Sequence, residues 1–220
     1  MADILSGRFD NFRLKYRLAK TGSQSETLLM IHGWGGDEDS MWVFSAKIPK
    51  SYSIIAPRGL YPVRQGGFRW SFNDDTEWNS IQEFEPAISS LLNLVNNDPF
   101  DMFKGDRLHL LGFSQGAALC YGFAALYPRL VSSIGGLAGF LPAGLEAMQS
   151  GSALQGVQVF ISHGSEDDVV PIIKARQAVD FFVEAKADVT FCESASGHKL
   201  DASCYTALGK FYKNLDHASG

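Results

Sequence analysis

A serine lies between two glycines at residues 112–116, in the sequence Gly-Phe-Ser-Gln-Gly. The stretch before it, RLHLL at 107–111, is typical of a buried strand, and AALCY at 117–121 is typical of a helix. A serine at such a strand-to-helix turn is presented as a nucleophile, and the glycines leave room for the sharp turn. The helix N-terminus also favours developing negative charge. Ser114 is therefore our candidate nucleophile, with a simple helix cap as the alternative.

A serine hydroxyl needs a base within hydrogen-bond reach, and the chain offers five histidines. His198, in SASGHK, follows an apolar run and lies downstream of both the serine and a candidate acid, which fits the order Ser, acid, His. His32 and His163 each precede a glycine after an apolar run and remain possible. His109 falls inside a predicted strand and is expected to pack in the core. We therefore predict His198 as the base.

The acid that orients this base should follow another apolar run, between the serine and the histidine. Asp167 and Asp168, in HGSEDDVVP at 163–171, meet this condition. The residues alone do not separate these two neighbours. Either carboxylate could instead cap the helix that we expect to begin near Pro171.

Backbone amides that could hold an oxyanion are predicted at two places. One is the amide of Gln115, directly after the serine. The other lies in the Gly-rich loop HGWGG at 32–36, which follows an earlier apolar run. This loop matches neither GxGxxG nor GxxxxGK[ST], so we expect no nucleotide site.

The elements that must position these residues alternate along the chain. The predicted strands are short apolar runs at 28–31, 52–56, 107–111, 131–137, 157–162 and 189–192. The predicted helices lie at 81–95, beginning near Pro86, at 172–187 and at 204–212. This alternation predicts an α/β fold with a mostly parallel sheet and helices on both faces, plus an antiparallel edge strand at 12–19. The candidate residues then gather beyond the carboxyl ends of the strands.

Composition and charge exclude several classes of protein. Of the 220 residues, 45% are hydrophobic and 20% are charged, and the formal net charge is −5. These values are typical of a globular chain and exclude a disordered or coiled-coil one. Because the basic residues are scattered, we expect no nucleic-acid partner and no stable membrane association. We expect a single domain over 1–220, either monomeric or dimeric.

The three cysteines, Cys120, Cys192 and Cys204, are odd in number and far apart, and they form no CxxC pair. We therefore expect no zinc site and no thioredoxin-type motif, and a reducing compartment is the simplest interpretation. The N-terminal segment MADILSGRFDNF lacks a continuous apolar run and does not predict a secretory signal. A cytoplasmic protein is expected, unless a signal has been removed.

On these motifs the chain resembles the phospholipase/carboxylesterase branch of the α/β-hydrolases, which includes acyl-protein thioesterases. The resemblance runs from about residue 27 to the last helix and rests on Ile31-His32-Gly33, GFSQGA at 112–117, HGSEDDVVP at 163–171 and Gly197-His198. It implies an α/β-hydrolase fold with little or no lid and with no cofactor or metal. It also implies Asp167 as the acid and Trp34 as the second oxyanion donor. Family members often carry Leu or Met at the position of Trp34, whose indole could narrow the acyl pocket or form one of its walls.

The function that this resemblance implies is a serine carboxylesterase for short- to medium-chain esters, working through an acyl-enzyme. An acyl-protein thioesterase or a lysophospholipase would use the same residues, and a non-catalytic ligand-binding module is the alternative outside enzymes. The candidate pocket residues are aromatic: Phe68, Trp70, Phe72, Trp78 and Phe140. They could equally pack a surface excursion onto the sheet. Since the segments 61–80 and 139–155 are short for a large lid, we expect an open site for a small-molecule ester.

Overall fold

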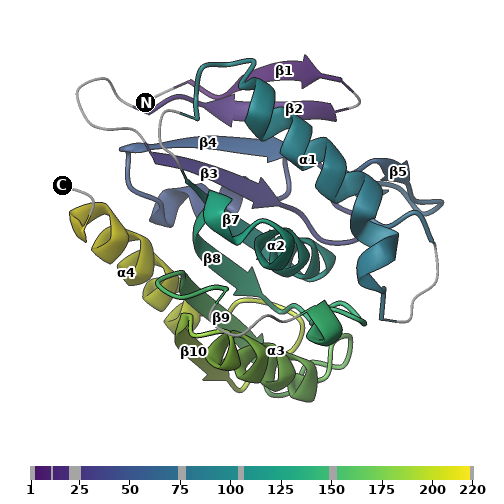
Figure 1. Ribbon diagram of the computed structural model, residues 1–220, viewed down its shortest axis with the longest axis vertical. Helices are drawn as coiled ribbons and strands as arrows, with labels where there is room; N and C mark the ends of the chain where they lie inside the picture. Colours follow the sequence, from purple (N-terminus) through teal and green to yellow (C-terminus); the bar gives the residue numbers. More distant parts are fainter. Residues whose placement is uncertain are drawn as a thin grey trace.

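A sheet of eight strands crosses the molecule in the order β1-β2-β4-β3-β7-β8-β9-β10, as the computed structural model shows (Figure 1). The structure describes residues 3–10, 12–19, 26–73, 78–103, 107–148 and 153–218. The strands of the sheet are β1 (Leu5–Phe9), β2 (Phe12–Arg17), β3 (Glu26–Ile31), β4 (Tyr52–Pro57), β7 (Leu108–Phe113), β8 (Val131–Leu137), β9 (Gln158–Gly164) and β10 (Asp188–Ser194). From β4 to β10 all neighbours pair in parallel. The predicted mostly parallel sheet is confirmed, whereas the single domain over 1–220 stays a prediction.

The six predicted strands coincide with β3, β4, β7, β8, β9 and β10. All six residues of β4 are buried, as are five of the six in β3. A strand covered on both faces keeps apolar side chains on both, so it appears in the sequence as a continuous apolar run.

The antiparallel strand predicted at 12–19 is present as β2, but the prediction that it forms the edge is wrong. The edge strand is β1, which pairs antiparallel with β2, while β2 pairs antiparallel with β4. The sequence LSGRF of β1 lacks an apolar run because most of its side chains are exposed or half-buried. Its pattern therefore gave no strand signal.

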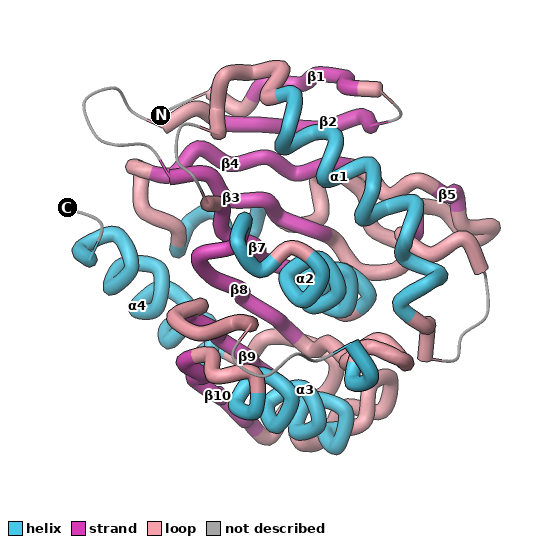
Figure 2. Tube along the Cα trace, viewed as in Figure 1, coloured by secondary structure: helices cyan, strands magenta, loops and turns pink. Residues whose placement is uncertain are grey.

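Helices cover both faces of the sheet, as predicted. The helices α1 (Glu85–Asn97), α2 (Gln115–Leu126) and α3 (Ile172–Glu184) share one apolar cluster and lie in front of the strands in Figure 2. The helix α4 (Ala202–Ala218) packs into a second cluster with the short helix η1 (Trp42–Lys47). The shorter elements are β5 (Tyr61–Pro62), β6 (Phe68–Arg69), η2 (Ile81–Phe84), η3 (Pro128–Leu130) and η4 (Glu146–Met148).

The uncharged stretch at 108–128 has the length of a membrane span, but the structure divides it between β7 and the buried helix α2. Within the described residues, no helix has both the length and the apolar character to cross a membrane.

A disulfide joins Cys192 of β10 to Cys204 in the first turn of α4. The two residues are 12 apart in sequence, yet their Cα atoms lie 5.8 Å apart because the chain turns back after β10. Cys120 is free and buried. The disulfide argues against the reducing compartment expected from the cysteine count, because such bonds persist in oxidising compartments. It also closes the loop that carries His198.

Candidate active site

Ser114 occupies a sharp turn between β7 and α2. Its backbone dihedrals, φ 53° and ψ −119°, lie in a region that non-glycine residues rarely adopt. A side chain would not fit at either of the two neighbouring glycines. A Cβ on Gly112 would stand 2.4 Å from the carbonyl oxygen of Gly116. A Cβ on Gly116 would stand 2.2 Å from the carbonyl oxygen of Ile31. The two glycines therefore let the turn pack against β3 while it presents the serine.

His198 lies in the loop after β10 and faces Ser114. Its Nε2 is 3.0 Å from the Oγ of Ser114, and its Nδ1 is 2.7 Å from Oδ2 of Asp167. Because a carboxylate only accepts hydrogen bonds, Nδ1 carries the proton, and Nε2 of the neutral ring can accept from the serine hydroxyl. The ring of Phe113 packs on the imidazole, with 5.1 Å between ring centroids. The structure thus brings together the predicted serine, histidine and acid.

The two neighbouring aspartates have different environments. The side chain of Asp167 is fully buried, and its Oδ1 accepts hydrogen bonds from the amides of Val169 and Val170, at 2.9 and 2.8 Å. Asp168 is exposed. Of the two, only Asp167 contacts His198. The conformation of the turn after β9 therefore decides between two candidate acids that the residues alone did not distinguish.

His163, a possible base by sequence, lies behind this aspartate. Its Nε2 donates to the carbonyl oxygen of Val170 at 2.6 Å and is 3.3 Å from Oδ2 of Asp167. Burial lowers the pKa of His163, which favours the neutral ring. The ring helps to fix the turn that holds Asp167, a role that the sequence pattern did not indicate. His109 is buried in the core, as predicted.

The two predicted oxyanion donors belong to backbone segments close to Ser114. Gln115 is the first residue of α2, directly after Ser114, and Trp34 belongs to the loop after β3. This loop passes close to the serine, because a Cβ on Gly33 would stand 3.2 Å from the Cβ of Ser114. The indole of Trp34 is 44% exposed and lines the cavity at the serine. Both backbone segments therefore lie beside Ser114.

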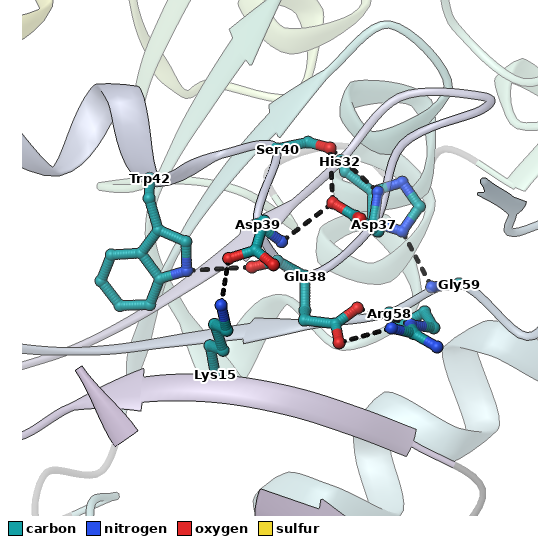
Figure 3. A network of polar contacts seen from close by, with 9 residues as sticks. All are labelled: Lys15, His32, Asp37, Glu38, Asp39, Ser40, Trp42, Arg58 and Gly59. Atoms are coloured by element: carbon teal, nitrogen blue, oxygen red, sulfur yellow. Dashed lines mark hydrogen bonds and ion pairs between the residues drawn. The ribbon is translucent and has the colours of Figure 1, made fainter. Parts of the chain in front are cut away.

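A polar network holds the loop that carries Trp34 (Figure 3). The guanidinium of Arg58 donates two hydrogen bonds to the carboxylate of Glu38, at 2.5 and 2.6 Å, and Lys15 forms an ion pair with Asp39. The indole of Trp42 donates to the carbonyl oxygen of Glu38 at 2.9 Å. These contacts fix the loop to β2, to η1 and to Arg58, the residue after β4.

His32 anchors the start of this loop from within the core. Its Nδ1 donates to the carbonyl oxygen of Gly33 at 2.7 Å. Its Nε2 accepts from the amide of Gly59 at 2.8 Å, as Figure 3 shows. Only the neutral ring can make both contacts, since protonated Nε2 no longer accepts. Burial accordingly lowers the pKa of His32 to about 4.

This arrangement predicts that acid destabilises the protein through His32. Its pKa is near 6.5 in the unfolded chain and about 4 in the folded one, so the unfolded state binds the proton more tightly. The contribution of neutral His32 to the free energy of unfolding is fully present above about pH 6.5. It falls as the pH drops towards 4, by up to about 3 kcal/mol. Urea unfolding of wild type and His32→Gln between about pH 7.5 and pH 5 checks this. Equal pH slopes in the two proteins would contradict it.

The five aromatic residues predicted for the substrate pocket do not line the cavity beside Ser114. The cavity beside Ser114 has a volume of about 420 Å³, and its lining does not include any of the five. Its lining residues are Gly33, Trp34, Gly35, Gly36, Ser40, Met41, Val43, Phe44, Phe113, Ser114 and His198.

The contacts of these aromatic side chains explain why they do not line the cavity beside Ser114. Trp70 is fully buried, and its indole donates to the carbonyl oxygen of His32 at 2.8 Å, so it supports the loop from below. The backbone of Phe68 accepts a hydrogen bond from the amide of Gly35 and donates one to the carbonyl oxygen of Gly36. Trp78 and Phe140 pack edge to face, 5.2 Å apart, and Phe72 is exposed. Trp70 is therefore a packed residue, as the alternative interpretation of the segment expected, and a role in substrate binding for the other four stays a prediction.

The side chain of Gln115 has a role that sequence reasoning missed. Its Oε1 accepts from the amide of Trp70 at 2.9 Å, and its Nε2 donates to Ser71 and Asn79, each at 3.1 Å. This buried amide links the aromatic segment to α2, the helix that begins after Ser114. In the sequence, the polar residues Ser71 and Asn79 within the aromatic segment are the signal that could have indicated this role.

No group of three or more His, Cys, Asp or Glu side chains that could hold a metal ion occurs within the ranges that the structure describes.

Comparison with models of known protein families identifies the family of this chain. The sequence profile of the phospholipase/carboxylesterase family matches residues 18–217. Acyl-protein thioesterase 1 of Saccharomyces cerevisiae is 28% identical over 181 residues, which cover 72% of this chain and 79% of the yeast protein.

Solved structures with the same fold include a carboxylesterase from Mesorhizobium loti, with a TM-score of 0.81, 20% identity and coverage of 96% of this chain and 98% of that one. Acyl-protein thioesterase 2 of Zea mays gives a TM-score of 0.75 at 22% identity, covering 94% of this chain and 99% of that one.

Proposed function

This chain belongs to the phospholipase/carboxylesterase family of hydrolases, and we propose that it acts as a serine carboxylesterase on short- to medium-chain esters. The observation that carries the proposal is the hydrogen-bonded series from Ser114 through His198 to the buried Asp167, which borders a cavity. A serine, an imidazole and a carboxylate in this order are the components of nucleophilic acyl transfer.

In the first half of the proposed reaction, Nε2 of His198 removes the hydroxyl proton of Ser114 while Oγ bonds to the ester carbonyl carbon. The carbonyl oxygen becomes an oxyanion, which the backbone amides of Trp34 and Gln115 stabilise. The bond to the alcohol oxygen then breaks, and His198 gives its proton to that oxygen. The alcohol leaves, and the acyl group stays on Ser114.

In the second half, water takes the place of the alcohol. His198 removes a proton from the water, whose oxygen bonds to the acyl carbon, and the same amides stabilise the second oxyanion. The bond to Oγ breaks, and Ser114 recovers its proton from His198. Asp167 keeps the ring oriented and stabilises the imidazolium in both halves. These steps require no metal or organic cofactor.

A second candidate function is thioester hydrolysis, because the yeast relative is named acyl-protein thioesterase 1. A lysophospholipase would also use the same three side chains. The chemistry of an ester and of a thioester requires the same machinery, so the choice depends on the pocket. The open cavity near Ser114, bordered by the exposed Trp34, favours small esters.

Initial rates on p-nitrophenyl esters from acetate to palmitate, beside S-acyl thioesters of the same acids, test the proposal. We expect the largest kcat/KM on short or medium oxygen esters. A rate that rises steadily to palmitate, or a preference for long-chain thioesters, would instead support the thioesterase or lysophospholipase.

The proposed partner is a small-molecule ester. Location in the cytoplasm stays a prediction, and the Cys192–Cys204 disulfide weighs against it.

A further inference from the structure

A second cavity adjoins the one at the nucleophile. Its volume is about 460 Å³. Its lining residues are Val43, Phe44, Phe113, Lys199, Leu200, Ala202 and Tyr205. Because Val43, Phe44 and Phe113 line both cavities, the two form one groove, which leads from Ser114 to the start of α4. We call the part beyond the first cavity the α4 groove.

Contacts between η1 and α4 hold the α4 groove in shape. The hydroxyl of Tyr205 donates to the carbonyl oxygen of Val43 at 2.8 Å, and the rings of Phe44 and Tyr205 lie 6.2 Å apart. The ammonium group of Lys47 lies 4.7 Å from the centre of the Tyr205 ring. Walls fixed in this way bind a ligand without first having to be ordered.

The side chains that line the α4 groove are mostly apolar and are partly exposed to solvent. Val43 is 63% exposed although it is a large hydrophobic residue. Its neighbours Phe44, Phe113 and Leu200 are only half-buried. An apolar chain that covered these side chains would remove apolar surface from water on both molecules, which favours binding.

The position of His198 decides which half of an ester can enter the α4 groove. In the tetrahedral intermediate the oxyanion faces the amides of Trp34 and Gln115, and the alcohol oxygen must lie within reach of Nε2 to be protonated. His198 lines the first cavity, and Lys199 and Leu200, the next two residues of the chain, line the α4 groove, so the groove lies on the histidine side of Ser114. A substituent on the alcohol oxygen can therefore extend from His198 into the α4 groove.

We propose that the α4 groove binds the alcohol part of the substrate, so that this enzyme acts on esters of short acids with extended apolar alcohols. The proposal rests on the esterase function and adds the substrate class to it. Val43, Phe44 and Tyr205 are the residues that determine the alcohol preference.

Two matched series of esters test the proposal. In one, acetate is joined to primary alcohols from methanol to hexanol, whose similar leaving-group acidity leaves size as the variable. In the other, methanol is joined to acids from acetate to hexanoate. Acid release in a pH-stat gives kcat/KM for both. We expect a rise of about two- to fourfold per methylene in the alcohol series, as burial of each methylene predicts, and a shallower rise in the acid series.

A variant links the preference to the α4 groove. Val43→Asp places a charge on the lining and is expected to lower the ratio of kcat/KM for hexyl acetate to that for methyl acetate by about tenfold. The matched control is Val183→Asp, because Val183 is 53% exposed on α3, borders neither cavity, and should leave the ratio unchanged.

The outcomes separate this proposal from the esterase function. If hydrolysis depends on Ser114 but the alcohol series is flat, or the acid series is the steeper one, the α4 groove proposal is overturned and the esterase stands. An unchanged ratio in Val43→Asp overturns the proposal as well. If no ester of either series is hydrolysed, both proposals fall.

Discussion

Replacement of Ser114 by alanine is expected to lower kcat on p-nitrophenyl esters by roughly 10⁴-fold or more. The variant has no Oγ to attack the carbonyl, so the acyl-enzyme cannot form. Its amides and cavity stay in place, which leaves substrate binding and a small residual rate. Steady-state kinetics on the purified variant give the loss directly.

The matched control is Ser89→Ala, an exposed serine on α1, which should keep the wild-type rate. A fluorophosphonate probe adds an independent measurement, because it reacts only with an activated serine. Intact mass should show one added phosphonyl group on the wild type and on Ser89→Ala, and none on Ser114→Ala. Equal rates in wild type and Ser114→Ala would contradict the esterase.

The second large effect is expected from Asp167→Asn, with a loss in kcat of about 10⁴-fold. The oxygen of asparagine can still accept from the amides of Val169 and Val170, so the turn should keep its shape. Its NH₂ group would then face Nδ1 of His198 and favour the tautomer with a proton on Nε2. That nitrogen could no longer accept the proton of Ser114.

Asp168→Asn provides an unusually close control. It makes the same chemical change one residue further on, at an exposed position, and should alter kcat by less than about twofold. Thermal unfolding of both variants shows whether the fold is kept. Similar losses in the two variants would mean that Asp167 does not orient the histidine.

The sequence predicted most of the strands and helices because burial determines where apolar residues occur along the chain. Buried strands give continuous apolar runs, and helices with one buried face give apolar residues at helical spacing. The strands β3, β4, β7, β8 and β9 are covered on both faces and appear as apolar runs. The helix α1 begins at Glu85, next to the Pro86 that predicted its start. The edge strand β1 was missed because its exposed side chains are free to be polar or small.

In the candidate active site, too, some residues could be predicted from the sequence and others could not. Ser114 could be found by sequence because the requirement for glycines on both sides is local to the turn. The choice between Asp167 and Asp168 could not be made from the residues, although the resemblance pointed to Asp167. It depends on which carboxylate the turn after β9 directs inward. The placing of the aromatic segment and the closeness of Cys192 to Cys204 also depend on contacts between distant parts of the chain.

The sequence by itself therefore determined the α/β fold class, the family, and the residue types that could carry out acyl transfer. The fold class follows from strand and helix periodicity, the candidate serine from the glycines around it, and the family from the resemblance of four short motifs. Tertiary structure alone decided that Asp167 contacts His198, that Trp70 supports the loop rather than lining the cavity, and that η1 and α4 form a groove. The physical reason is that these contacts join segments far apart in the chain, whose approach depends on how the whole sheet and its helices pack.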